Sequence, residues 1–279
     1  MYILPCFILI MLFSFIPSFM SIYYSFTKFR GVEAPLFIGL DNYKRLFKDP
    51  FVKAAIWNTV RYTFIVVPFH TALPLILAAV LTSFFRNKIG GFIKSVLFVP
   101  VISSMVLCGV VWSYMLSAES YGVVNSVLGI IGIGPVNWLG RTQTSLIGIC
   151  IVAIWKSVGY YLVIYYAAIM DIPRSLYEAA EVDGANSVHQ LLYITLPSLR
   201  PIILMVVTLG IIWSFQAFDL VYTMTAGGPG MSTVTLVYTV YTSAFREFNM
   251  GYACSIAVFL LILIMFVTGL QRFAFKRWG

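Results

Sequence analysis

The sequence predicts an all-α membrane protein that crosses the bilayer six times. Of its 279 residues, 61% are hydrophobic and 10% are charged, against roughly 45–50% and about 25% in soluble domains. Six apolar runs are long enough for a helix that crosses a ~30 Å hydrocarbon core. The runs are continuous rather than alternating, which favours helices over barrel strands. The expected spans are residues 2–26, 58–84, 96–117, 146–170, 201–223 and 251–271.

All six spans are expected to belong to one domain, residues 1–279, because the connecting loops are too short to fold independently. The first run is interpreted as a retained span. It has no basic segment before it, it is too long for a signal peptide, and no small-residue cleavage site follows it.

Cysteine and histidine give no sign of a metal, redox or catalytic site. Each cysteine lies alone in a different apolar run, without a CxxC pair, which favours a packing role. The two histidines have no matching set of ligands around them in the sequence. These residues are Cys6, Cys108, Cys150 and Cys254, and His70 and His189.

The net charge of +8 is carried mainly by loops that flank the apolar runs. Basic residues in such places face lipid headgroups or set the topology, so nucleic acid is not an expected partner. Lys and Arg are equally numerous in alternate loops, so charge alone does not decide which side of the membrane the loop at residues 171–200 faces.

Two other loops carry recognisable patterns. Within residues 27–57, the stretch DNYKRLFK predicts a short amphipathic helix along the membrane surface, with Asp41 as its N-cap and Pro50 as the interruption. Residues 118–145 are apolar but broken by Gly and Pro, and are expected to form a partly buried or re-entrant segment.

The loop at residues 171–200 is unusually polar and has clear helix signals. Pro173 suits a first helical turn, and Ser175 with Glu178 has the spacing of a capping box. Asp183 and Gly184 then end this helix, because glycine accepts the left-handed backbone that helix ends need.

A second helix follows directly, with Asn186 or Ser187 as its cap, and it runs toward Pro197 and the next span. The small side chains of Ala179 and Ala180 would let another surface approach the first helix closely. The loop is therefore either a docking element or simply a well-capped connection between two spans.

The spacing within this loop resembles the cytoplasmic EAA loop in permease subunits of binding-protein-dependent ABC importers. The pattern is EAA-x3-G-x9-I-x-LP, formed by Glu178, Ala179, Ala180, Gly184, Ile194, Leu196 and Pro197. Residues 215–233, FQAFDLVYTMTAGGPGMST, are similar to the carbohydrate-uptake branch of these permeases, which includes maltose- and glycerol-phosphate-type proteins. GLDNYKRLF in the first loop fits the same branch. One departure is that the family usually begins with a basic cytoplasmic tail, so a short tail or a late start is expected.

The resemblance implies the type I ABC importer permease fold in a bacterial inner membrane, with both termini and the 171–200 loop in the cytoplasm. It also implies three partners: a second homologous permease, a cytoplasmic ATPase dimer and an extracellular solute-binding protein. The chain has no G-x4-G-K-[ST], and GGPG at residues 227–230 lacks the lysine and hydroxyl of a phosphate-binding loop. A non-catalytic subunit is therefore expected, with ATP and Mg bound by the partner ATPase and no cofactor on this chain.

Charged residues inside spans are candidates for the solute path, because each costs about 2.5–3.5 kcal/mol at mid-membrane. Lys156 lies near the middle of the fourth span, and Asp219 near the outer end of the fifth. A carboxylate beside aromatic rings suits a sugar, whereas Asp219 could instead hold a loop at the interface or pair with Lys156. The other candidates for the path are Trp155, Trp213, Gln216, Phe218 and Tyr222.

Two other classes of membrane protein fit the sequence less well than an importer does. A secondary carrier would need several membrane-embedded carboxylates and usually more spans. A membrane enzyme would need a cluster of His, Asp or Cys at one membrane face, which the sequence lacks. The solute stays open between a sugar, an oligosaccharide, a glycerol phosphate and another polar molecule.

Overall fold

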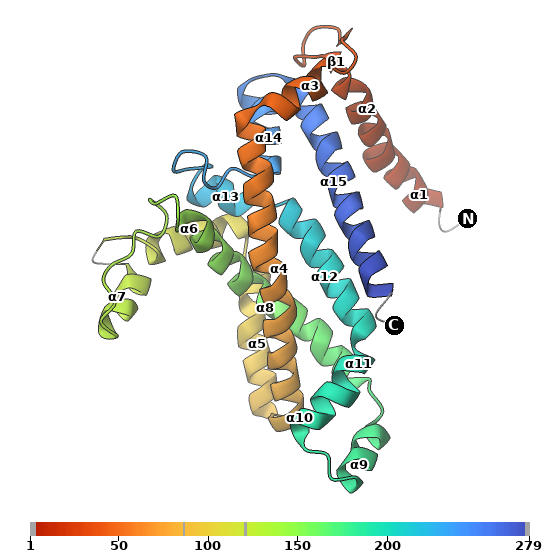
Figure 1. Ribbon diagram of the computed structural model, residues 1–279, viewed down its shortest axis with the longest axis vertical. Helices are drawn as coiled ribbons and strands as arrows, with labels where there is room; N and C mark the ends of the chain where they lie inside the picture. Colours follow the sequence, from red (N-terminus) through yellow and green to blue (C-terminus); the bar gives the residue numbers. More distant parts are fainter. Residues whose placement is uncertain (1–3, 86, 120–121, 277–279) are drawn as a thin grey trace.

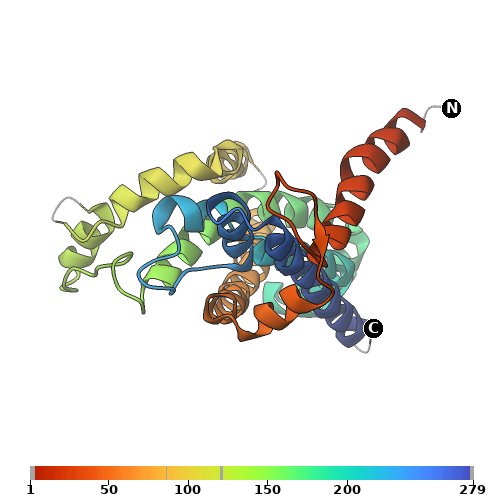
Figure 2. The same cartoon turned by 90° about the horizontal axis from the view of Figure 1, so that it is seen from above.

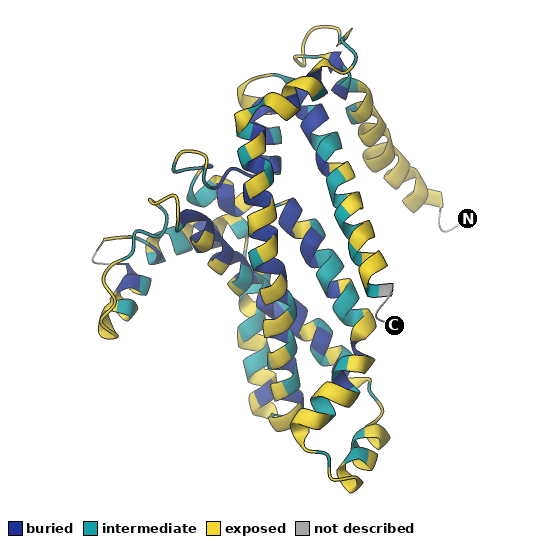
Figure 3. Ribbon diagram, viewed as in Figure 1, coloured by how far each residue is buried: buried dark blue, intermediate teal, exposed yellow. Residues whose placement is uncertain are grey.

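The computed structural model describes residues 4–85, 87–119 and 122–276. Long helices form its centre: α4 (Pro50–Phe84), α8 (Ser145–Met170), α12 (Arg200–Phe215) and α15 (Met250–Lys276). Helix α4 packs along both α8 and α12, and α12 also packs against α15 (Figure 1). The interior between these apolar helices is where the buried residues lie, and their outer faces are exposed (Figure 3).

Within the described residues, four helices are long and apolar enough to cross a membrane, or up to six if each of two bent helix pairs counts as one span. The predicted spans 146–170 and 251–271 match α8 and α15 closely. Helix α4 begins earlier than predicted, at Pro50, because the side chain of Asp49 caps it by accepting a 2.9 Å hydrogen bond from the Phe51 N–H.

The first span is a helical stretch that leans away from the bundle (Figure 2). It consists of α1 (Leu4–Ile10), a π-helical segment (Met11–Phe15) and α2 (Ile16–Ser25). Its most apolar window is 0% buried, and α2 contacts the bundle through α15. Residues 2 and 3 of the predicted span lie outside the described residues.

The first loop lies at the end of the molecule opposite α9 (Arg174–Val182) (Figure 1). Strands β1 (Thr27–Lys28) and β2 (Leu36–Phe37) pair antiparallel there, with Thr27 opposite Phe37, and α3 (Asp41–Lys48) is the predicted amphipathic helix. The prediction of Asp41 as N-cap was wrong. The cap position is Leu40, and the Asp41 carboxylate in the first turn lies 2.9 Å from the Lys44 ammonium.

Two predicted spans were wrong as continuous helices. Residues 96–117 form α5 (Lys88–Ile102) and α6 (Met105–Met115), which bend by 102° at two serines in extended conformation. Residues 201–223 form α12 and then a separate α13 (Asp219–Met224). Hydropathy reports apolar length and not backbone direction, so it missed both breaks.

The segment at 118–145 folds around one buried amide. Its helix α7 (Val123–Ile130) is mostly exposed, whereas Asn125 is buried. The Asn125 amide donates to the carbonyls of Ser117 and Val136 at 3.0 and 2.9 Å, and accepts hydrogen bonds from the Val136 N–H and the Trp138 indole. Only part of this segment is therefore buried in the chain.

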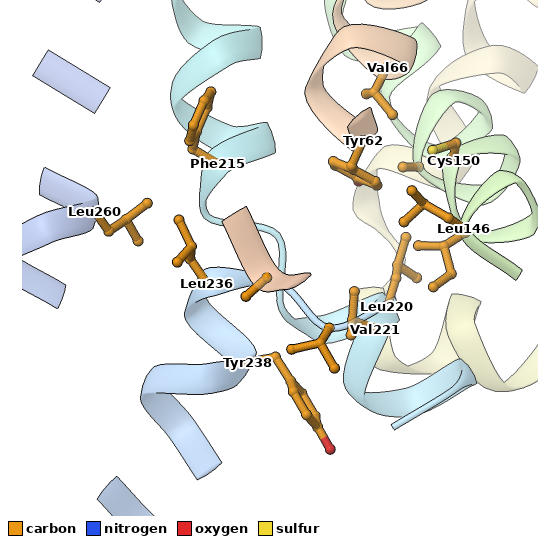
Figure 4. Close-up of a cluster of buried hydrophobic side chains, with 14 of the residues drawn as sticks. Tyr62, Val66, Leu146, Cys150, Phe215, Leu220, Val221, Leu236, Tyr238 and Leu260 are labelled. Atoms are coloured by element: carbon orange, nitrogen blue, oxygen red, sulfur yellow. The ribbon is translucent and has the colours of Figure 1, made fainter. Parts of the chain in front are cut away.

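The main hydrophobic core lies where α4, α8, α12, α13, α14 (Leu236–Tyr241) and α15 meet. A π-helical segment, Thr242–Arg246, continues α14. Cys150 lies in this core, which agrees with the packing role expected for it. Figure 4 shows the core side chains Tyr62, Val66, Leu146, Cys150, Phe215, Leu220, Val221, Leu236, Tyr238 and Leu260.

Candidate functional site

The 171–200 loop is a helix, a tight turn and a second helical segment, as predicted. Helix α9 (Arg174–Val182) ends in a Schellman arrangement. The Gly184 N–H donates to the Glu181 carbonyl at 3.0 Å, and the Ala185 N–H donates to the Ala180 carbonyl at 2.8 Å. Gly184 has φ +78°, the left-handed conformation that the sequence predicted.

The predicted capping box at Ser175 and Glu178 was wrong. Helix α9 starts two residues earlier than this box requires, at Arg174 after Pro173, and no side chain caps it. The second helical segment comprises α10 (Ser187–Gln190), a π-helical segment (Leu191–Thr195) and α11 (Leu196–Ser198). Of the two candidate caps it uses Asn186, whose side chain accepts from the His189 N–H at 2.9 Å.

The loop lies at the far end of the molecule from β1 and α3 (Figure 1), and several of its apolar side chains are exposed. Val182 is 89% exposed and Tyr193 is 74% exposed. Beside them lies a cleft of about 330 Å³ that includes Ala180 and Gly184 in its wall. Exposed apolar surface of this kind is typical of a protein-binding surface.

The loop is also braced from within. The Tyr177 hydroxyl lies 2.9 Å from the Thr195 hydroxyl, which ties α9 to the segment after the turn. At the junction with the next span, Leu196 is half-buried and Pro197 is exposed in α11, and the chain then bends by 69° into α12. Glu178 and Ala179 point outward on α9 and are exposed.

A second candidate site is a cavity of about 250 Å³ inside the bundle, here called the central cavity. Its wall is formed by α4, α6, α8, α12, the break that follows α12, and α13. Because the chain turns at Gln216–Phe218, polar groups from the end of one helix and the start of the next reach the same space. The lining residues are Tyr62, His70, Met105, Ile149, Ala153, Ser157, Trp213, Ser214, Gln216, Ala217, Phe218, Asp219, Leu220 and Val221.

The central cavity brings together four of the seven predicted path residues: Trp213, Gln216, Phe218 and Asp219. The other three lie elsewhere. Trp155 stacks edge-on against Trp112, with ring centroids 5.3 Å apart, and faces an apolar groove of about 860 Å³ between α4, α5 and α8.

Lys156 is buried but binds main-chain groups. Its ammonium donates to the Pro100 and Val101 carbonyls at 3.1 and 3.2 Å. These carbonyls end α5 just before the 102° bend, where the helix dipole favours a positive charge. The pairing with Asp219 that the sequence left open is not made. Gly159, one turn further along α8, allows close contact because a β-carbon there would collide with the Leu97 carbonyl.

Tyr222 belongs to an exposed aromatic cluster beside the central cavity. Its ring stacks on Phe218 at 5.4 Å and meets Tyr241 edge-on at 5.3 Å. The Arg246 guanidinium lies 5.9 Å from the Tyr222 ring centroid. The cluster joins the cavity through Phe218, which is a member of both.

Sequence reasoning missed the α4 wall of the central cavity. Tyr62 and His70 are 5% exposed and line the cavity. The available signal was an ionisable residue, His70, inside an apolar run. It was not followed because no matching ligand residues surround His70 in the sequence. The polar residues across the cavity, Ser157, Gln216 and Asp219, lie more than eighty positions away along the chain.

The fold and the two sites define a polytopic helical membrane protein with a cavity lined by both polar and apolar side chains, and with a projecting loop suited to a protein partner. Residues 72–279 match the family described as binding-protein-dependent transport system inner membrane component, and the chain belongs to this family.

Individual relatives agree with this family. The chain is 34% identical to the arabinooligosaccharides transport system permease protein AraP of Bacillus subtilis (strain 168), over 83% of this chain and 74% of that protein. It is 33% identical to the lactose transport system permease protein LacF of Rhizobium radiobacter, over 99% of this chain and 93% of that protein. Its fold is similar to that of a bacterial ABC transporter involved in the import of the acidic polysaccharide alginate, with a TM-score of 0.86, 23% identity, and coverage of 99% of this chain and 94% of that one. The type I permease fold and the importer family predicted from the sequence are thereby confirmed.

Proposed function

We propose that this permease subunit carries a sugar or oligosaccharide across the membrane after an extracellular solute-binding protein delivers it. Two relatives are named for transport of arabinooligosaccharides and lactose. The central cavity supports the same class of solute. Trp213 and Phe218 offer rings for the apolar face of a sugar, and Gln216 and Asp219 offer hydrogen-bonding groups for its hydroxyls.

The same cavity favours a sugar over a glycerol phosphate. Among the residues that the structure describes, no Lys or Arg lines it, and Asp219 would repel a phosphate. The Lys156 ammonium instead donates to the Pro100 and Val101 carbonyls.

Transport is driven, in this proposal, by a cytoplasmic ATPase dimer that seats the 171–200 loop. Helix α9 supplies Glu178, Ala179 and Ala180 as the contact surface, and Gly184 supplies the rigid turn behind it. Leu196 and Pro197 transmit the movement to α12. ATP and Mg belong to the ATPase, and this chain binds no cofactor. The observation that carries the proposal is the braced loop with its exposed Val182.

In this proposal, the 171–200 loop and both termini lie in the cytoplasm of a cell with a bacterial-type inner membrane, and residues 27–49 lie outside. A second homologous permease completes the pathway. The helix Leu4–Ser25 supports this partner, because it leans out of the bundle and leaves its apolar side chains uncovered by this chain (Figure 2).

The coupling assignment is tested by co-purification with the ATPase and the second permease from a shared expression system. Glu178→Lys should release the ATPase, because a cation replaces an exposed acid on the contact surface. Glu181→Lys is the matched control, since it makes the same charge change on α9 outside the EAA pattern, and it should retain the ATPase. Retention by Glu178→Lys, or equal loss from both variants, would overturn the assignment of Glu178.

A further inference from the structure

Four aromatic rings form a continuous run beside the central cavity, here called the aromatic cluster: Phe218, Tyr222, Tyr241 and Phe245. Ring centroids are 5.4 Å apart between Phe218 and Tyr222, and 5.1 Å apart between Phe218 and Tyr241. Those of Tyr241 and Phe245 are 5.5 Å apart. Helices α13 and α14, which carry the cluster, lie in the half of the molecule that holds α3, away from the 171–200 loop (Figure 1).

The aromatic cluster combines accessible apolar rings with polar groups. Phe245 is 61% exposed and Tyr222 is 38% exposed. The Arg246 guanidinium lies 5.9 Å from the Tyr222 ring centroid and 6.0 Å from that of Tyr241, within reach of a cation–π contact. Two tyrosine hydroxyls and a guanidinium can hydrogen-bond to hydroxyl groups. A sugar has the matching surface, with C–H groups on its ring face and hydroxyls along its edge.

The size of the central cavity gives a reason for a second binding surface. At about 250 Å³ the cavity is smaller than the roughly 300–1,000 Å³ of pockets that enclose drug-sized ligands. It can therefore enclose only part of an oligosaccharide, and the remaining sugar units must lie outside it.

The aromatic cluster begins where the wall of the cavity ends. Phe218 lines the cavity and stacks on Tyr222. Asp219, which also lines the cavity, and Tyr222 are both exposed and lie three positions apart on α13, so they share one face of that helix. A sugar chain that leaves the cavity past Asp219 therefore meets the ring of Tyr222 next.

We propose that the aromatic cluster, with Arg246, is a second sugar-binding subsite, which holds the units of an oligosaccharide that extend out of the central cavity. The subsite rests on the proposed import of a sugar. It adds Tyr241, Phe245 and Arg246 to the solute path predicted from the sequence, and it favours solutes of two or more sugar units over a single one.

The rival role for the aromatic cluster is a contact with the second permease. Photo-crosslinking separates the two roles, because it identifies what touches a chosen side chain. p-Benzoylphenylalanine replaces Phe245 in one variant and Phe248 in the other. Phe248 is the matched control, since it is 63% exposed, lies three residues further along the chain and is outside the cluster.

The complete complex is irradiated in proteoliposomes, with ATP inside and binding protein loaded with a radiolabelled sugar outside. The sugar is whichever of lactose and arabinotriose the wild type takes up. Position 245 should attach the label to this chain, and position 248 should not. Absence of label at position 245, with or without a crosslink to the second permease, would overturn the subsite, and so would equal labelling at both positions.

The contribution of the ring to transport is measured as initial uptake at a limiting concentration of sugar-loaded binding protein, per assembled complex. Uptake by Phe245→Ala should fall about three- to tenfold, the range of one aromatic contact, and uptake by Phe248→Ala should stay within about twofold of the wild type. Wild-type uptake by Phe245→Ala would overturn the subsite. A failure of the proposed function looks different, because the wild type would then take up neither sugar in an ATP-dependent way.

Discussion

The 171–200 loop and the central cavity are built in opposite ways. The loop is made from one continuous stretch, whose turn is fixed by Gly184 and whose second segment is capped by Asn186. The central cavity is assembled from five helices and the break between α12 and α13, so that His70 and Asp219 line the same space although they are far apart in the sequence.

This difference determines how each region can be altered. The loop works as a rigid body, so a backbone change at one position should disable it as a whole. The cavity works through several separate side chains, so each single substitution there should lower uptake only in part. The predictions below test this contrast from the largest expected effect to the smallest.

Gly184→Val should abolish uptake while membrane insertion stays normal. The residue has φ +78°, and a β-branched side chain there is a genuine conformational outlier. Space is not the obstacle, because a β-carbon would meet nothing within 4 Å. Uptake in proteoliposomes is the measurement.

Gly184→Asn is the matched control, since Asn tolerates the left-handed conformation better than other non-glycine residues. It should retain most of the uptake. Normal uptake by Gly184→Val would show that the turn is not needed in a rigid form, and the contrast between loop and cavity would then fail.

Asp219→Asn should lower uptake about tenfold without abolishing it, because a hydrogen bond from a solute hydroxyl to a charged group is exchanged for a neutral one. The comparison variant is Glu247→Gln, which removes an exposed acid that does not line the central cavity. If both variants take up sugar at the wild-type rate, Asp219 serves only the local structure of α13.

Lys156→Met should have the smallest effect, a fall of about 2–4 °C in the melting temperature of the purified complex for a loss of about 1 kcal/mol. The Val101 carbonyl would lose its donor, whereas the Pro100 carbonyl still accepts from the Ser103 N–H at 3.2 Å. Lys88→Met removes an exposed lysine of α5 and should leave the melting temperature unchanged. A rise in the melting temperature of Lys156→Met would mean that burying the ammonium destabilises the complex by more than its two hydrogen bonds stabilise it.

The sequence predicted well whatever depends on neighbouring residues. Helices α8 and α15, the amphipathic α3, the turn at Gly184 and the cap at Asn186 all follow from local patterns. The errors at Asp41 and Ser175 are local as well. In each case the helix begins earlier than its polar side chain suggested, by one residue at Asp41 and by two at Ser175, and helix ends commonly differ by one or two residues.

The sequence could not predict what depends on three-dimensional packing. The bend between α5 and α6 is held by Lys156 from another helix, and hydropathy along 96–117 carries no trace of that contact. Lys156 was expected in the solute path because a charge buried in the membrane usually marks a functional site. In the structure its ammonium binds the carbonyls at the end of α5. His70 was not predicted as a site residue, because the polar residues that line the cavity with it lie on helices far away in the sequence.

The most direct test of the importer is ATP-dependent uptake by the wild-type complex in proteoliposomes, with radiolabelled lactose or arabinotriose and the solute-binding protein outside. Uptake should require both the binding protein and internal ATP, and it should stop when the ATPase is omitted. Uptake that continues without ATP, driven by an ion gradient alone, would contradict the coupling of the 171–200 loop to an ATPase and would favour a secondary carrier.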